Sequence, residues 1–270
     1  MLAVDGTQLH VERRGSGAPL LLVQGMGANC THWGEPFLEA LEHDFELLLY
    51  DHRGIGRSGR SAGELTIARL AADALALLDA LEIPAAHVLG ISMGGMIAQE
   101  LALAAPQRVM TLALGCTSCG GTQSSATPPE VVQRLTVAAL SGDRERLLRA
   151  GFELVVSRGY AADAANYAAF AAVARQFPPT LTALMEQKAA IERFDAYARL
   201  RSLGVPTLVL HGSEDMMLAP SNGELVASLI PGARLELLDA AGHLFFWEQP
   251  QRSAQLVREF ALAEIPSSGC

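Results

Sequence analysis

The chain alternates short apolar runs with segments whose apolar residues recur at helical spacing. The apolar runs predict buried strands over 20–23, 45–51, 85–91, 109–116, 206–212 and 233–239. Helical periodicity predicts helices over 65–81, 93–104 and 249–263. Because strands that alternate with helices form parallel sheets covered on both faces, the pattern predicts an α/β protein.

The first residues of the chain show the alternation of a β-hairpin. They read "MLAVDGTQLHVERRG", with Asp5-Gly6 at the turn. This stretch has no basic region followed by a long apolar run, so it does not resemble a signal peptide.

A long interruption separates two of the predicted strands, from about 119 to 201. It begins with "CGGTQSSATPP", which is rich in glycine, serine and proline, and continues with alanine and arginine at helical spacing, as in "AADAANYAAFAAVARQ". The segment therefore predicts an all-helical cap inserted into the core. The predicted division is 1–118 for the first part of the core, 119–201 for the cap and 202–270 for the second part of the core.

Composition excludes several classes of function. The 270 residues carry a net charge of −9 and give a pI of about 5.3, which argues against binding to nucleic acid or to an anionic membrane. No apolar run reaches the ~18 residues of a membrane span. The four cysteines are Cys30, Cys116, Cys119 and Cys270, too few and too scattered for a disulfide scaffold. We expect a cytoplasmic monomer or homodimer, with Cys116 and Cys119 packed at a strand end.

A candidate nucleophile lies at the junction of a predicted strand and a predicted helix. The stretch "VLGISMGGMIAQE" places Ser92 between Gly90 and Gly94. A sharp strand-to-helix turn exposes a serine while it strains its backbone, and bulky neighbours would clash across such a turn. The glycines therefore predict a nucleophile elbow, and the N–H groups of the following helix would point at the serine oxygen.

A serine hydroxyl needs a base, and the sequence offers two candidates. His243 follows a predicted strand and the small residues "AAG", which places it on a loop at the carboxyl edge of the sheet. His52 is the competitor, on the loop after "LLLYD", but "DHRGIGRSG" looks like a structural turn held by Asp51 and Arg53. We favour His243.

The base needs an acid that fixes its tautomer, and "LHGSEDMMLAP" provides two carboxylates after a predicted strand. The order Ser92, Asp215, His243 is the chain order that the nucleophile-elbow architecture uses. Glu214 remains the alternative acid.

Two backbone N–H groups are predicted to form an oxyanion hole. One belongs to Met93, directly after the nucleophile, and the other to Met26 in "LLVQGMGANC", where Gly25 and Gly27 allow a close approach. We expect Gly25, Leu244 and Phe245 to border the substrate, below cap aromatics such as Phe152 and Phe170. No metal or other cofactor is predicted.

Together these motifs resemble those of the α/β-hydrolase family, over nearly the whole chain. They are "VQGMGANC", "YDHRGIGRSG", "LGISMGGMIAQELA", "LVLHGSED" and "AAGHLFFWEQP", in the order and spacing of the family. The chain looks most similar to the compact, single-cap carboxylesterases, enol-lactonases and cofactor-free haloperoxidases. Haloalkane dehalogenases and epoxide hydrolases share the fold but use aspartate where this chain has Ser92.

The resemblance implies a mostly parallel, eight-stranded sheet whose second strand is antiparallel, with a helical cap between strands six and seven. It also implies Ser92 as nucleophile, Asp215 as acid, His243 as base and the backbone of Met26 and Met93 as oxyanion donors. The family usually has a histidine before the glycine of the oxyanion loop, where this chain has Gln24.

The predicted function is hydrolysis of a small to medium carboxylic ester or lactone through an acyl-enzyme. Because a helical cap would enclose the serine, we expect soluble esters with acyl chains of roughly C2 to C8 to be preferred over emulsified triglycerides. A carbon–carbon bond hydrolase or a perhydrolase would use the same triad. A receptor-like binding protein that retains the triad is the alternative from another class.

Overall fold

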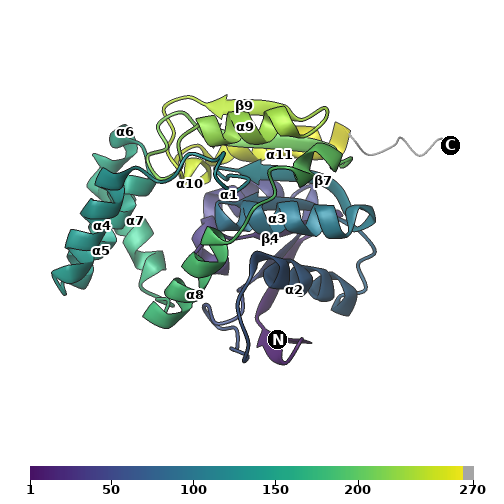
Figure 1. Cartoon of the computed structure of the whole chain (residues 1–270), viewed down its shortest axis with the longest axis horizontal. Helices are drawn as coiled ribbons and strands as arrows, with labels where there is room; N and C mark the ends of the chain where they lie inside the picture. Colours follow the sequence, from purple (N-terminus) through teal and green to yellow (C-terminus); the bar gives the residue numbers. More distant parts are fainter. Residues whose placement is uncertain (264–270) are drawn as a thin grey trace.

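A seven-stranded, mostly parallel sheet forms the centre of the protein, which a computed structural model describes for residues 1–263 (Figure 1). The strand order is β3-β5-β4-β6-β7-β8-β9, and every neighbouring pair is parallel except β3 with β5. The strands are β3 (Val11–Gly15), β4 (Ala18–Val23), β5 (Phe45–Tyr50), β6 (Ala86–Ile91), β7 (Val109–Gly115), β8 (Thr207–Gly212) and β9 (Arg234–Leu238). The predicted α/β class and the predicted antiparallel strand are confirmed.

The expected eighth strand is not part of this sheet. β1 (Leu2–Val4) and β2 (Thr7–Leu9) pair only with each other, as the predicted hairpin that turns at Asp5-Gly6. Both turn residues have positive φ, 37° and 72°, as a two-residue hairpin turn requires. Val4 and Leu9 are buried in the same hydrophobic cluster as the residues of a core helix, so the hairpin covers that helix instead of extending the sheet.

Helices cover both faces of the sheet. One face carries α2 (Ile67–Ala80), α3 (Met93–Ala104) and α9 (Ser221–Leu229), and the other α1 (Glu35–Leu41), α10 (Phe245–Glu248) and α11 (Pro250–Ala263). Alternate strand residues point into the two resulting cores: in β4, Leu21 and Val23 join one cluster and Leu20 and Leu22 the other. Three 3₁₀ helices complete the core, η1 (Cys30–Trp33), η2 (Pro106–Arg108) and η3 (Arg199–Ser202). Within residues 1–263, no helix is long and apolar enough to cross a membrane.

The connection from β7 to β8 is helical, as the sequence predicted. It contains α4 (Pro129–Leu140), α5 (Arg144–Val155), α6 (Arg158–Ala161), α7 (Ala164–Ala174) and α8 (Leu181–Glu192), which we call the cap. The two ends of the connection are hydrogen bonded to each other, Ala196 N–H to Cys119 O at 2.8 Å and Gly121 N–H to Phe194 O at 3.0 Å. Figure 1 shows α4 to α7 grouped beside the core, with α8 nearer to it.

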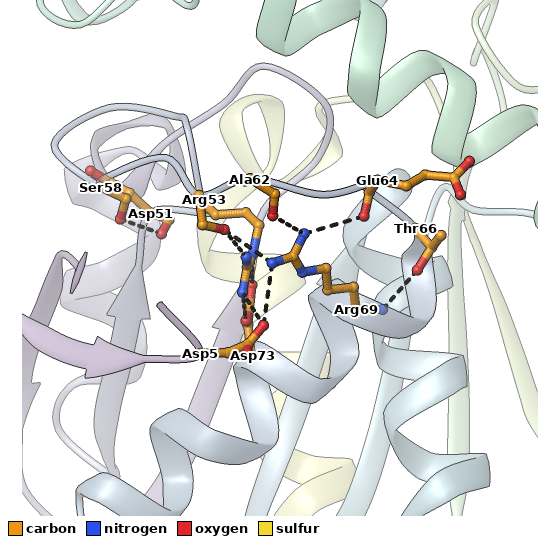
Figure 2. A network of polar contacts seen from close by, with 10 residues as sticks. Asp5, Asp51, Arg53, Ser58, Ala62, Glu64, Thr66, Arg69 and Asp73 are labelled. Carbon is orange, nitrogen blue, oxygen red and sulfur yellow. Dashed lines mark hydrogen bonds and ion pairs between the residues drawn. The ribbon is translucent and has the colours of Figure 1, made fainter. Parts of the chain in front are cut away.

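A buried ion pair fixes the loop after β5, which passes beside the site described below (Figure 2). Arg53 Nε donates to Asp73 Oδ2 at 2.6 Å, and the two side chains are 3% and 2% exposed. Arg53 also bonds to Ser61, and Arg69 donates to the carbonyl oxygens of Ala62 and Glu64 in the same loop. The structural role predicted for "DHRGIGRSG" is therefore confirmed.

Replacement of Asp73 by alanine should destabilise the protein strongly, because it removes the buried carboxylate that pairs with Arg53 and leaves the guanidinium only Ser61 and the exposed carboxylate of Asp5, at 3.4 Å. We expect a loss of about 3–5 kcal/mol in the free energy of unfolding, measured by urea denaturation. Asp79→Ala is the control on the same helix. Asp79 pairs with Arg108 but its side chain is 61% exposed, so its loss should cost less than about 1 kcal/mol. Equal losses for the two variants would contradict the role assigned to the buried pair.

Candidate active site

Ser92 occupies a strained turn between β6 and α3. Its φ of 57° and ψ of −121° are rare for a residue with a side chain, and the strain matches the predicted nucleophile elbow. The backbone around it is tied to the next strand. Ser92 N–H donates to Gly115 O at 2.9 Å, and the hydroxyl of Thr117 donates to Ser92 O at 2.7 Å. The surrounding fold therefore holds the serine in this conformation.

The glycines around the elbow are required by close backbone contacts. A Cβ at Gly94 would overlap Val23 O and lie 2.6 Å from Gln24 O, at the end of β4. A Cβ at Gly90 would lie 2.9 Å from the Cβ of Ala98 and would overlap the carbonyl of Gly94. The elbow can form only where these side chains are absent, which is the reason that the sequence pattern predicted.

Asp215 and His243 are hydrogen bonded to each other, across the loops that follow β8 and β9. His243 Nδ1 lies 2.7 Å from Asp215 Oδ2, and each residue is 6% exposed. The other carboxylate oxygen accepts the N–H groups of Met217 at 2.8 Å and Leu218 at 3.0 Å. The carboxylate is thus held from both sides, and its contact with Nδ1 leaves Nε2 of His243 without the proton in the neutral ring.

Burial alone would raise the pKa of Asp215, but the neighbouring His243 and His211 outweigh it and hold the pKa well below its usual value. The carboxylate therefore stays ionised opposite His243. Glu214, the alternative acid, lies on the outside of the loop, where its Oε2 accepts the N–H of Arg158 at 3.4 Å. The structure pairs Asp215 with the histidine and not Glu214.

Two further buried residues, His211 and Cys116, lie against this pair. His211, at the end of β8 and fully buried, has its Nε2 2.9 Å from Leu218 O and 3.2 Å from Asp215 Oδ2. Because a carbonyl only accepts, Nε2 of His211 carries a proton and faces the carboxylate as well. Cys116, at the end of β7, is buried with its thiol beside Gly242, and burial raises the pKa of that thiol. The sequence signal for both residues is their place at the carboxyl end of a strand: Cys116 directly follows β7, and His211 is the last residue but one of β8.

Cys116 lies between Ser92 and the hydrogen-bonded pair of Asp215 and His243 in the sense that it adjoins both. It follows Gly115, whose carbonyl accepts the Ser92 N–H, and its Sγ, an Asp215 oxygen and a His243 nitrogen lie within 4.8 Å of one another. These three residues, and separately His10, Cys30 and Asp51, are the groups in residues 1–263 that could contact a metal ion. In the first group, Asp215 and His243 already bond each other. Cys119 is buried and free, as predicted, and Cys270 lies outside the described residues.

The loop after β4 forms a tight turn over residues 25–28. Gly27 has a φ of 72°, as the third position of a type II turn requires, and the Ala28 N–H donates to Gly25 O at 3.3 Å. Gly25 faces the elbow directly, because a Cβ there would lie 3.3 Å from the Cβ of Ser92. The predicted close approach of this loop to Ser92 is thus present.

Within this loop, Met26 has the one backbone N–H without a partner in the described part of the chain. From Gly25 to Cys30, all the others are bonded: Gly25 to Gln24 Oε1, Gly27 to Gln187 Oε1, Ala28 to Gly25 O, Asn29 to His32 Nδ1 and Cys30 to Asp51 Oδ1. Met93 is the first residue of α3, so its N–H has no acceptor in the preceding turn. Two N–H groups without an acceptor in the described structure therefore belong to segments next to Ser92, the turn that follows β4 and the first residue of α3.

Gln24 and His52 hold the start of this loop through hydrogen bonds to backbone groups. Gln24 is buried, and its side-chain oxygen accepts the Gly25 N–H at 3.0 Å. His52 Nε2 donates to Gln24 O at 2.8 Å and is 1% exposed, and burial lowers the pKa of its ring. The His52 ring therefore binds the backbone carbonyl of Gln24, and no hydrogen bond joins it to Ser92 in the described structure.

The two residues after His243 lie in different environments. Leu244 contacts the cap: its N–H donates to Val155 O at 2.8 Å and its side chain packs against the cluster around Phe152. Phe245 is 1% exposed and belongs to the core below the sheet, with its ring close to Gly115. The structure thus places Leu244 between core and cap, and Phe245 within the core.

Comparison with known proteins places this geometry in a family. Residues 18–250 match the family model of the α/β hydrolase fold. The chain is 35% identical to the protein named "Putative carbamate hydrolase RutD" of Azorhizobium caulinodans, over 88% of each chain. Among solved structures, the enol-lactonase from Burkholderia xenovorans LB400 is 30% identical with a TM-score of 0.83, over 97% of this chain and 99% of that one. An esterase from Thermogutta terrifontis is 28% identical with a TM-score of 0.79, over 95% and 93%. The family predicted from the motifs is confirmed: this chain belongs to the α/β hydrolases.

Proposed function

We propose that the protein is a serine hydrolase that cleaves small to medium carboxylic esters or lactones through an acyl-enzyme on Ser92. The observation that carries the proposal is the strained elbow itself, with Ser92 held against a turn whose unpaired N–H belongs to Met26. Ser92 is half-buried in that strained conformation, as expected of a nucleophile on a sharp strand-to-helix turn beside unpaired N–H donors.

The first half of the proposed reaction forms the acyl-enzyme. Ser92 Oγ attacks the substrate carbonyl carbon while His243 Nε2 accepts the hydroxyl proton. Asp215 holds the ring in the tautomer with its proton on Nδ1 and stabilises the imidazolium. The N–H groups of Met26 and Met93 stabilise the negative charge on the carbonyl oxygen. The carbon–oxygen bond to the leaving alcohol then breaks, and His243 returns the proton to that oxygen.

The second half releases the acid. Water gives a proton to His243 and attacks the acyl carbon, and collapse of the tetrahedral intermediate frees the carboxylic acid while Ser92 Oγ regains the proton. Every proton transfer in the two halves uses the same nitrogen of one histidine. Neither half requires a metal ion or an organic cofactor.

The relatives support an acyl substrate and suggest a second candidate. A lactone is an internal ester, so the name of the enol-lactonase fits the proposed substrate class. The relative from Azorhizobium caulinodans is named for carbamate hydrolysis, and the same residues would attack a carbamate carbonyl. Carbon–carbon bond hydrolysis and perhydrolysis would also use this triad, so substrates must separate these reactions.

A panel of substrates tests the proposal. We expect hydrolysis of p-nitrophenyl esters, with the highest kcat/KM for soluble acyl chains of roughly C2 to C8, because α8 of the cap packs against the turn beside Ser92 and would limit the length of a bound acyl chain. Lactones, an aryl carbamate and a peroxide–acetate mixture run beside the esters. Ser92→Ala should abolish turnover without loss of thermal stability, and a fluorophosphonate should label the protein at Ser92. Labelling at Ser58, Ser61 or Ser213 instead would overturn the assignment, and a rate jump on emulsified triglyceride would contradict the chain-length preference.

Asp215→Asn should lower kcat about a thousandfold, because an amide cannot hold the Nδ1 proton of His243 in the same tautomer. Glu214→Gln on the same loop should change kcat less than about threefold, since Glu214 faces away from the histidine. Both variants are compared with p-nitrophenyl butyrate at saturation. Similar losses in the two would mean that the carboxylates share the role.

His243→Ala should cost at least about a thousandfold in kcat, the general scale for a catalytic-triad member. His52→Gln should cost far less, because the amide can still donate to Gln24 O, the hydrogen bond that the buried His52 ring makes. The measurement is kcat for each variant beside its melting temperature. A reversed order of the two losses would show that His52 is the base.

A further inference from the structure

A buried side chain of the cap is hydrogen bonded to the turn that follows β4. Gln187 lies in α8, 160 positions along the chain from Gly27, and its Oε1 accepts the Gly27 N–H at 2.8 Å. The side chain is 1% exposed, and its Nε2 has no hydrogen-bond partner among residues 1–263. The bond to Gly27 is therefore the polar contact that the buried amide of Gln187 makes in the described structure.

This bond decides which N–H of the turn stays free. Gly27 and Met26 are adjacent, and both of their N–H groups would be available as donors if Gln187 were absent. With Gln187 in place, the Gly27 N–H is occupied and the peptide between Met26 and Gly27 is fixed in orientation. Leu184, one turn earlier in α8, packs against the same glycine: a Cβ added at Gly27 would lie 2.7 Å from Leu184 Cδ2.

We propose that Gln187 is a positioning residue that sets the oxyanion hole from the cap. It accepts the Gly27 N–H and so holds the turn with only the Met26 N–H directed to the reacting carbonyl. The inference rests on the proposed function, because it assigns a role within that reaction. It implies that a displacement of α8 from the core would disable catalysis by loosening the turn, even with Ser92, Asp215 and His243 in place.

An oxyanion donor acts on the transition state, so the expected effect falls on kcat. Complete loss of one such donor costs about 10²–10³-fold in kcat, and a donor that is present but loosely held should cost less. For Gln187→Met, which keeps the size of the side chain and removes the acceptor, we expect kcat to fall about 10–100-fold with KM within about threefold of the parent.

Two further variants separate this role from packing. Gln187→Glu keeps an acceptor oxygen at the same position, so its kcat should stay within about fivefold of the parent. Glu186→Gln is the control on α8: it removes the exposed ion pair of Glu186 with Arg60, which also joins α8 to the core, and should leave kcat unchanged. Melting temperatures of all variants verify that each one folds.

The experiment measures kcat and KM with p-nitrophenyl butyrate, and the affinity for an aryl trifluoromethyl ketone, whose serine adduct places an oxyanion in the hole. In Gln187→Met, the inhibition constant should rise in proportion to the loss of kcat/KM. Parental kcat in Gln187→Met, or a Gln187→Glu variant as impaired as Gln187→Met, overturns the inference while the proposed function stands. If the parent protein hydrolyses no substrate of the panel, the proposed function fails and the inference fails with it.

Discussion

The close packing of the first turn of α3 against the end of β4 is the contact on which the site depends. Gly94 meets the carbonyl oxygens of Val23 and Gln24 with no side chain between the two backbones. This contact puts Ser92 at the helix N-terminus beside the turn that follows β4, so Ser92 and the unpaired N–H groups of Met26 and Met93 come from two segments in direct backbone contact. A single methyl group at Gly94 would separate them, which explains why the glycines are as necessary to the site as the serine.

Four neighbouring strands deliver the rest of the site to the same edge of the sheet. Because β6, β7, β8 and β9 are parallel and adjacent, the residues after them lie next to each other although up to 151 positions separate Ser92 from His243. The buried Asp215 carboxylate is stabilised there by two backbone N–H groups and two imidazole rings. A buried charge with fewer partners would cost more free energy, and the number of donors explains how the Asp215 carboxylate stays ionised beside His243.

The cap contacts both sides of the site by hydrogen bonds to backbone groups. Gln187 in α8 binds the oxyanion turn, and Val155 O accepts the N–H of Leu244, the residue after His243. Glu248 adds a third link, because its carboxylate accepts the N–H groups of Gly242 and Ser157, and burial raises its pKa. The cap is therefore hydrogen bonded to the turn of residues 25–28 and linked to the loop that carries His243.

β3 was not predicted as a strand of the sheet, because Val11–Gly15 continues the alternation of the hairpin and pairs with a strand distant in the chain. The sequence predicted the other six strands of the sheet, three core helices, the helical connection between β7 and β8 and the strained turn at Ser92, since each has a local signal: apolar runs, helical periodicity, or glycines around Ser92. It also placed Asp215 and His243 after the correct strands. Tertiary structure alone decided that the hairpin 2–9 stays apart from the sheet, that Glu214 faces outward, and that Phe245 is a core residue. It also brought His211 to the carboxylate and Gln187 to the turn. His211 meets Asp215, 4 positions away, and Gln187 meets Gly27, 160 positions away, only in the folded protein. The hydrophobic pattern of the sequence indicates which face of a helix or strand is buried, but not which polar atom a buried side chain meets there.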